Sequence, residues 1–222
     1  MHSFRQQGVT LISLMVGLLI SMVALLGMMS LYSTVVQSTT QSTRDARIAG
    51  ERSTALLLAF RQLLGAGFGI LDTTYGKDLL LKVGGSLDTD DRLSGGTSVA
   101  IGNEGNTLIW RWISQPGEVG EKRWCGGLHV QPSSSEQAGL YMLQPQTCNT
   151  VTDPESWEVR PLLIDNSDAA GESIPITITI EDGDCSVLGI AGGGQVSVSL
   201  RTEDHSSNEI ISPTCLINFT SG

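Results

Sequence analysis

Four cysteines, Cys125, Cys148, Cys185 and Cys215, offer the most direct chemistry in this sequence. None forms a Cys-x-x-Cys pair, and no histidine lies near one at metal-ligand spacing, so the pattern does not favour a zinc site. An even number of cysteines in an exported region favours two disulfides, for which three pairings are possible. We favour Cys125–Cys148 and Cys185–Cys215 because each closes a local loop. Free buried thiols in a cytoplasmic domain are the alternative.

Catalytic chemistry has little support elsewhere in the sequence. The three histidines, His2, His129 and His205, belong to no nucleophile, metalloprotease or phosphate-binding motif. The glycine run in "GIAGGGQVSVSL" precedes a strand-like pattern, whereas a phosphate loop needs a helix N-terminus, so we expect a hairpin or loop there. The sequence therefore predicts a protein that is not an enzyme and that has no cofactor and no metal site.

Acidic clusters and tryptophans are the remaining candidates for ligand binding. The stretches "LDTDDRLSGG" and "IEDGDCS" could coordinate calcium, but neither has EF-hand spacing, and we expect acidic turns. The tryptophans are Trp110, Trp112, Trp124 and Trp157, and core packing or interface contact is the commoner role of such residues. A formal net charge of -10 and a pI near 4.6 argue against a nucleic-acid partner, which would require basic groups on phosphates.

The amino-terminal region has the length and composition of a membrane-spanning helix. No Asp, Glu, Lys or Arg occurs between Arg5 and Arg44. The chain is apolar from Val9 to Leu31 apart from small hydroxyl residues, and such a helix rises about 34 Å, enough to cross a hydrocarbon core of about 30 Å. Arg5 favours a cytoplasmic amino terminus and an exported remainder. A cleaved secretory signal fits less well, because its apolar core is shorter and an A-x-A site should follow.

A glycine, Gly8, stands between the short basic leader and the run "VTLISLMVGLLISMVALLGMM". This combination resembles the class III signal of type IV pilins and of the pseudopilins of type II secretion. The resemblance implies that a prepilin peptidase cuts between Gly8 and Val9 and methylates the new amine of Val9. Val9 departs mildly from the family, in which the first mature residue is usually Phe.

The fifth residue after the implied cut is Ser13, where the family usually has a glutamate that pairs with a neighbouring subunit's terminal amine. Ser13 cannot form that ion pair, although its hydroxyl can bond to the carbonyl of Val9. Either the subunit tolerates this loss, or it occupies the filament tip, where the pair is not needed. Ser13, Gly17 and Ser21 also recur at four-residue spacing, and such stripes of small residues let membrane helices approach closely. Chance occurrence is an equal alternative for this stripe.

The helix is predicted to continue beyond the membrane. The segment up to Leu64 has no proline and shows helical apolar spacing, and glycines at 65, 67 and 69 should end it. Gly50 is its weak point, costing about 1 kcal/mol relative to alanine. The sequence "AFRQLLGAGFG" resembles the end of this helix in PilW-like minor pilins, because an apolar, Arg-bearing turn is followed by Ala-Gly-aromatic-x-Gly.

Four regions follow from these patterns. We expect a leader at residues 1–8, a transmembrane and filament-core helix at 9–36, an amphipathic half-helix at 37–64, and a β-rich head with two disulfides at 65–222. Within the head, period-two alternation predicts strands with shared inward faces. Those faces are Ile174, Ile176, Ile178 and Ile180; Val196, Val198 and Leu200; and Leu108, Trp110 and Trp112. "GLYMLQ", "WEVRPLLI" and "PTCLINF" read as further strands. The fold class is α+β, a long amino-terminal helix packed on an antiparallel sheet.

The resemblance implies a structural minor pilin that primes or caps a type IV pilus and supports twitching motility and adhesion. Its expected partners are other minor pilins, the major pilin, prepilin peptidase, the inner-membrane assembly platform and a tip adhesin. Its expected location is the bacterial inner membrane, in a single pass with a cytoplasmic amino terminus, and the pilus after assembly. A minor pseudopilin of type II secretion, or a membrane-anchored binding or adhesin domain outside any filament, are the alternatives.

Overall fold

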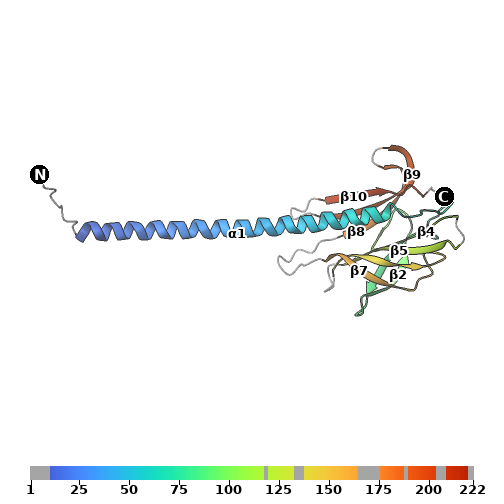
Figure 1. Ribbon diagram of the computed structural model, residues 1–222, viewed down its shortest axis with the longest axis horizontal. Helices are drawn as coiled ribbons and strands as arrows, with labels where there is room; N and C mark the ends of the chain where they lie inside the picture. Colours follow the sequence, from blue (N-terminus) through green and yellow to red (C-terminus); the bar gives the residue numbers. More distant parts are fainter. Residues whose placement is uncertain are drawn as a thin grey trace. The chain divides into compact units, whose positions relative to one another are not determined.

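The computed structural model describes residues 11–117, 120–132, 138–164, 176–187, 190–203 and 209–219. The chain divides into two compact units, Met1–Gly50, which we call the stem unit, and Glu51–Gly222, which we call the head unit. One α-helix, α1 (Leu11–Leu63), contributes to both units (Figure 1). The division falls at Gly50, the position where the sequence indicated a weak point in the helix.

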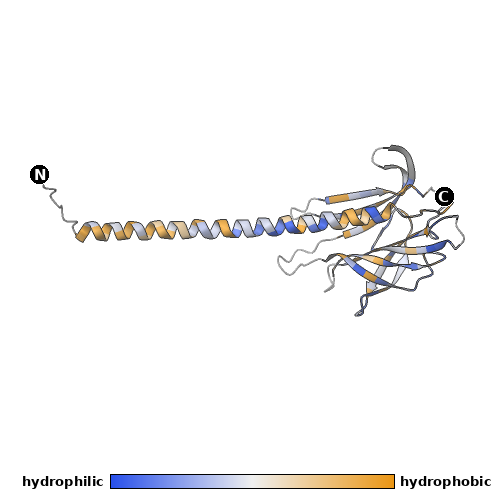
Figure 2. Ribbon diagram, in the orientation of Figure 1, coloured by the Kyte–Doolittle hydropathy of each residue, from blue (hydrophilic) through white to orange (hydrophobic). Residues whose placement is uncertain are grey.

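In the stem unit, α1 exposes all its side chains from Leu11 to Thr43. Apolar residues dominate the amino-terminal part of α1, and hydrophilic residues become frequent only further along the helix (Figure 2). Arg44 is the first charged residue of α1. By length and composition, α1 contains a candidate membrane span. An isolated apolar helix of this kind is stable in lipid because all its backbone polar groups pair within the helix.

In the head unit, the last turns of α1 bury one narrow face. Arg52, Ala55, Ala59 and Leu63 are buried, at spacings of three and four residues. This is the spacing of a single helix face, and its two alanines allow the strands to approach the helix backbone closely. The amphipathic pattern predicted for this part of the helix therefore describes its packing in the head.

Six strands of the head unit form a closed antiparallel barrel in the order β1-β2-β7-β6-β5-β4. They are β1 (Leu79–Leu87), β2 (Arg92–Ser98), β4 (Thr107–Ser114), β5 (Lys122–Gln131), β6 (Gly139–Thr147) and β7 (Ser156–Ile164). A second antiparallel sheet has the order β10-β9-β8-β3. Its strands are β3 (Glu104–Gly105), β8 (Ile176–Val187), β9 (Ile190–Glu203) and β10 (Glu209–Cys215).

Two hydrophobic cores result from this arrangement. The barrel interior contains Leu80, Leu93, Ile109, Cys125, Leu143, Cys148, Val151 and Trp157. The larger core joins side chains of three elements: the end of α1, the outer face of the barrel, and β8 with β9. Strand β4 contributes to both cores, with Leu108 and Trp110 on its outer face and Ile109 on its inner face. Burial on both faces explains why β4 is apolar along nearly its whole length.

Most of the predicted alternation is confirmed. Side chains at 176, 178, 180, 196, 198 and 200 are all buried, whereas Ile174 lies outside the described residues. Leu108, Trp110 and Trp112 share the larger core as expected. Trp110 and Trp157 are buried, and Trp112 and Trp124 are partly buried.

The α+β class, the long amino-terminal helix and the antiparallel pairing of the strands are confirmed, but the strands form two sheets, a closed barrel and a four-stranded sheet. Barrel closure pairs β1 with β4, which are separated by a hairpin and by β3, and no local pattern signals such a distant pairing. The glycine run lies at the start of β9, which pairs with β8 as a hairpin, so of the two expected forms the hairpin is confirmed. Two local expectations need correction. "IEDGDCS" is no turn but extends β8 through a bulge, and the last strand ends at Cys215, before a turn.

Candidate functional site

The stem helix is the first candidate site, because a long run of large apolar side chains is exposed along it. Leu11, Ile12 and Met29 are among the most exposed, and the pattern continues to Val36. Contiguous apolar surface of this length indicates a lipid or protein environment. Gly8 and Val9, the predicted processing residues, lie outside the described residues.

Small residues form a shallow stripe on this helix. The Ser21 hydroxyl donates to the Gly17 carbonyl at 2.8 Å. No heavy atom lies within 4 Å of the position that a Cβ at Gly17 would occupy, so the helix surface is open there. Ser13 is exposed four residues earlier, while Val9, its expected partner, lies outside the described residues. The three residues therefore occupy one face on which a second helix could approach.

Further hydroxyl groups along α1 bond to the helix itself. Thr34 donates to the Ser30 carbonyl at 3.0 Å, and Thr39 and Thr43 donate to carbonyls one turn earlier at 2.8 Å. These bonds satisfy the hydroxyl protons within the helix, so the cost of placing these groups in apolar surroundings is reduced. This polar part of the helix therefore remains compatible with close contact to other helices.

The turn that follows α1 is fixed to β4 by two backbone hydrogen bonds. The Gly67 N–H donates to the Arg111 carbonyl at 2.8 Å, and the Ile113 N–H donates to the Phe68 carbonyl at 2.8 Å. Gly67 has a φ of 73°, a left-handed conformation that favours glycine. The glycines that were predicted to stop the helix thus also connect it to the barrel.

The chain's last described turn packs against the same place. The Asn218 side-chain amide donates to the Ala66 carbonyl at 2.8 Å, and the Thr73 hydroxyl donates to the Asn218 carbonyl. Phe219 is fully buried in the larger core. The carboxyl-terminal turn therefore holds the segment that follows α1, and no sequence pattern predicted this contact.

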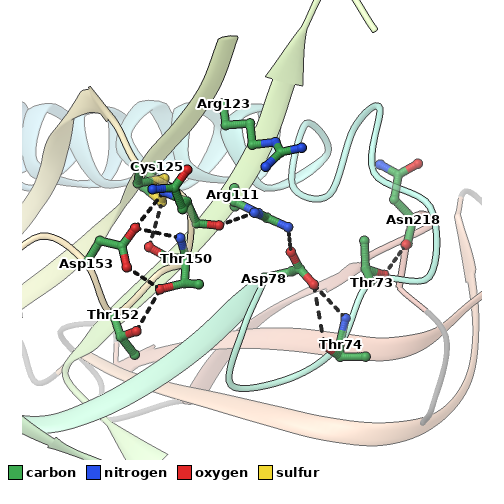
Figure 3. A network of polar contacts seen from close by, with 12 residues as sticks. Thr73, Thr74, Asp78, Arg111, Arg123, Cys125, Thr150, Thr152, Asp153 and Asn218 are labelled. Carbon is green, nitrogen blue, oxygen red and sulfur yellow. Dashed lines mark hydrogen bonds and ion pairs between the residues drawn. A yellow bond between two sulfur atoms is a disulfide. The ribbon is translucent and has the colours of Figure 1, made fainter. Parts of the chain in front are cut away.

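A buried ion pair lies inside one end of the barrel (Figure 3). The Arg111 guanidinium of β4 pairs with the Asp78 carboxylate and also donates to the Asn149 carbonyl. The other Asp78 oxygen accepts the Thr74 N–H at 3.0 Å. Both charged side chains are almost completely buried, so this network ties the turn before β1, strand β4 and the loop after Cys148 together.

The loop after Cys148 is organised by Asp153. This carboxylate accepts the Thr150 hydroxyl and the backbone N–H groups of Asn149 and Thr150. The bond from the Thr150 hydroxyl and those from the two N–H groups lower the pKa of Asp153 below its ordinary value. Asp153 is therefore ionised at neutral pH, and it fixes the carbonyl that Arg111 contacts.

Both favoured disulfides are present. Cys125 bonds to Cys148 with Cα atoms 5.8 Å apart, and Cys185 bonds to Cys215 with Cα atoms 5.6 Å apart. The first staples β5 to the loop that carries Asn149 and Asp153, and the second joins β8 to the end of β10. The two bonds thus stabilise different sheets of the head unit.

A second polar cluster lies inside the barrel around His129, which is fully buried on β5. Its Nδ1 is 2.8 Å from the Thr107 hydroxyl, and its Nε2 is 2.9 Å from the Gln131 side-chain oxygen. Burial lowers the pKa of His129, although hydrogen bonding to Gln131 opposes that effect. The imidazole is therefore neutral at neutral pH and serves as a core hydrogen-bonding group.

The residues that the sequence singled out do not form one common site. The structure brings together each cysteine pair and places Ser13, Gly17 and Ser21 on one helix face. It adds Asp78, Arg111 and Asn149, whose importance no sequence motif signalled, because long-range strand pairing creates their contact. No family model matches the chain, and neither a curated protein nor a solved structure is significantly similar to it.

Proposed function

We propose that this protein is a structural minor pilin, resembling the PilW family, that primes or caps a type IV pilus. The observation that carries the proposal is the exposed apolar helix from Leu11 to Val36, which follows directly on the Gly8–Val9 boundary. An ordinary membrane anchor does not require glycine at that boundary. In the proposed life cycle, the protein is inserted in the bacterial inner membrane, trimmed after Gly8 and methylated at Val9.

Assembly would then proceed by burial of the stem helix. The apolar side chains of α1 leave lipid and pack against helices of the major pilin and of other minor pilins, so their apolar environment is preserved. Van der Waals contact between helices drives such association, and small residues increase it. Gly17 and Ser21 supply the required close approach, since the position of a Gly17 side chain is open and the Ser21 hydroxyl is satisfied internally.

Ser13 favours a position at the filament tip. The usual glutamate at this place pairs with the terminal amine of an adjacent subunit, and a serine cannot replace that charge. A subunit at the tip has no neighbour whose amine needs this partner. The head unit would then be displayed at the end of the filament, where it could contact a surface or a tip adhesin.

A second candidate function is a membrane-anchored binding domain outside any filament. The single candidate membrane span among the described residues fits that function equally well. A membrane-anchored binding domain differs from a pilin in that it requires no prepilin peptidase.

A minor pseudopilin of type II secretion would be processed like a pilin. It differs from a pilin in that it co-purifies with components of the secretion machinery.

The proposal is tested in the strain that encodes the protein. Deletion should remove most surface pili and twitching motility, and the wild-type gene should restore both. The Gly8→Ala variant should fail to restore them because the precursor is not cut. Gln6→Ala is the matched control, because Gln6 lies in the same leader and would be removed with it, so its replacement should leave cleavage and piliation unchanged. Normal piliation in the deletion strain would exclude the pilin function.

Position within the filament is tested by immunogold labelling of the native protein. We expect gold particles at pilus ends. Uniform labelling along the shafts would overturn the tip assignment. Loss of protein secretion with intact pili, together with co-purification of secretion components, would instead identify a pseudopilin.

A further inference from the structure

An open cleft lies at the end of the barrel that contains the Arg111–Asp78 pair. It is bounded by the segment at residues 69–71, the β4–β5 hairpin and the start of the loop after Cys148, and its volume is about 900 Å³. An adjoining hollow of about 620 Å³ shares Glu121, Arg123 and Asn149 with it. We call these two hollows together the barrel-mouth cleft. Barrel mouths are frequent ligand sites because loops of several strands converge there.

Basic residues are concentrated in this cleft. Among the described residues, the basic groups lining it are Lys77, Arg111, Lys122 and Arg123, and the acidic groups are Glu121 and Asp153. The whole chain has only 13 Lys and Arg against 23 Asp and Glu. Asp78 neutralises Arg111, so the charges left in the cleft are Lys77, Lys122 and Arg123 against Glu121 and Asp153. This small excess of basic groups on an otherwise acidic protein attracts anionic partners and orients them during encounter.

Strand register sets the direction of the two arginines. Arg111 pairs with Cys125, and Ile113 pairs with Arg123, so both arginines lie on the face of the β4–β5 ladder that bears Cys125. Figure 3 shows both guanidinium groups on this side of the strands. Arg111 is held by Asp78 and Asn149, and its Nε is buried with no hydrogen-bond partner among the described residues.

Arg123 is the adjustable member of the pair. Its side chain is half exposed, and its ion pair with Glu121 is long, at 3.6 Å. An exposed pair of this length contributes little to stability, so a carboxylate from outside can compete with Glu121 at small cost. Lys77 is also exposed at the rim of the cleft. Arg123 and Lys77 therefore line the same hollow and are both accessible to an incoming acidic group.

Apolar side chains complete the rim. Leu71 is 91% exposed and lines the cleft, and Phe68, just before the cleft residue Gly69, is 53% exposed. Large apolar residues beside exposed basic side chains are typical of protein recognition surfaces, where they supply contact area and the charges supply specificity. The expected occupant therefore carries carboxylates next to an apolar side chain.

We propose that the barrel-mouth cleft binds an acidic segment of a partner protein. Carboxylates of that segment pair with Lys77 and Arg123, and an apolar side chain of it packs against Leu71. All cleft residues belong to the head unit. The proposal consequently does not depend on filament assembly, and it would apply equally to a head displayed by a simple membrane anchor.

The test uses the full chain, solubilised in detergent, and a fluorescent peptide of alternating glutamate and leucine. Anisotropy should show saturable binding that weakens when salt is raised from about 0.05 M to about 0.3 M, since exposed charge pairs are screened. A lysine–leucine peptide should not bind. The Lys77→Glu/Arg123→Glu variant should weaken binding by about tenfold or more, and Leu71→Ser should weaken it further. Arg160→Glu is the matched control, because Arg160 is an exposed arginine outside the cleft.

Three results would overturn the proposal. They are an absence of saturable binding, equal weakening by the control and the cleft variants, and equal binding of the lysine peptide. Inorganic phosphate that displaces the peptide completely at low millimolar concentration would show a general anion site and would equally contradict a protein partner. Circular dichroism spectra identical to that of the wild type would establish that the variants fold. The proposal is supported if none of the contradicting results appears and the cleft variants lose affinity as expected.

Discussion

The ring of Phe219 lies 2.8 Å from the position that a Cβ atom at Gly67 would occupy. Gly67 belongs to the turn that ends α1, and Phe219 belongs to the last described turn of the chain. The turn after α1 and the carboxyl-terminal turn thus meet at a point where a residue larger than glycine would clash with the Phe219 ring. The backbone bond from Gly67 to Arg111 then connects this meeting point to the barrel.

Replacement of Gly67 by alanine should destabilise the head unit by about 2–4 kcal/mol, because left-handed strain and overpacking against Phe219 add together. Gly76→Ala is the control, since Gly76 has a similar φ of 88° but no heavy atom near the added Cβ. Urea unfolding gives the loss of stability for each variant. Gly76→Ala reports the backbone strain alone, and Gly67→Ala reports the same strain together with the clash against Phe219. Equal losses of stability would show that the contact with Phe219 is not restrictive.

Removal of one member of the Asp78–Arg111 pair should cost about 3–5 kcal/mol, because the remaining charge is buried without its partner. We expect Asp78→Asn and Arg111→Met each to lower the urea midpoint strongly, and the double variant to lose less than the sum of the two. The exposed pair Arg201–Glu181, at 3.5 Å, provides the comparison. Glu181→Gln should change stability by less than about 1 kcal/mol. Additive losses at Asp78 and Arg111 would contradict a coupled pair.

The two disulfides should have separable effects. Replacing Cys125 and Cys148 by serine releases the loop that carries Asn149, and a closed loop of this size contributes about 3 kcal/mol in the chain-entropy model. That variant should also weaken binding of the acidic peptide, whereas the Cys185/Cys215 variant should lose similar stability without changing peptide affinity. Non-reducing peptide mapping first checks that both bonds form in the native protein. Equal effects on affinity would remove the link between the loop and the cleft.

Acidification should destabilise the head unit through His129. Burial lowers the pKa of His129 in the folded state, so the unfolded chain binds the proton first as the pH falls. The free energy of unfolding should therefore decrease below a pH of about 6.5, by up to about 1.4 kcal/mol per pH unit. His129→Gln lacks this titration and should show a smaller stability difference between pH 7.5 and pH 5. Parallel losses in the wild type and the variant would assign the acid sensitivity to other groups.

Local sequence patterns predicted those features that depend on neighbouring residues. The period of two in "ITITI" placed Ile176, Ile178 and Ile180 on one face. The end of the helix was predicted at the glycines after Leu64 because glycine readily adopts non-helical conformations. The cysteine pairings followed from short loop closure. Each of these predictions needs only a few adjacent residues or one small loop.

Contacts between distant segments could not be predicted in the same way. Barrel closure, the Asp78–Arg111 pair and the packing of Phe219 on Gly67 join residues that no periodicity relates. The inner face of β4 illustrates the difficulty, since Arg111 in an apolar strand suggests a solvent-facing residue. It is buried because Asp78 reaches it from the turn before β1, and one sequence alone does not show that partner.

The proposed pilin function requires that this chain be processed as a prepilin. Mass spectrometry of the amino-terminal peptide, from cells with and without prepilin peptidase, tests it most directly. We expect an N-methylated Val9 terminus in the first cells, the intact leader in the second, and an uncut Gly8→Ala precursor in both. An intact Met1 in peptidase-competent cells, or a cut at any other position, would contradict it.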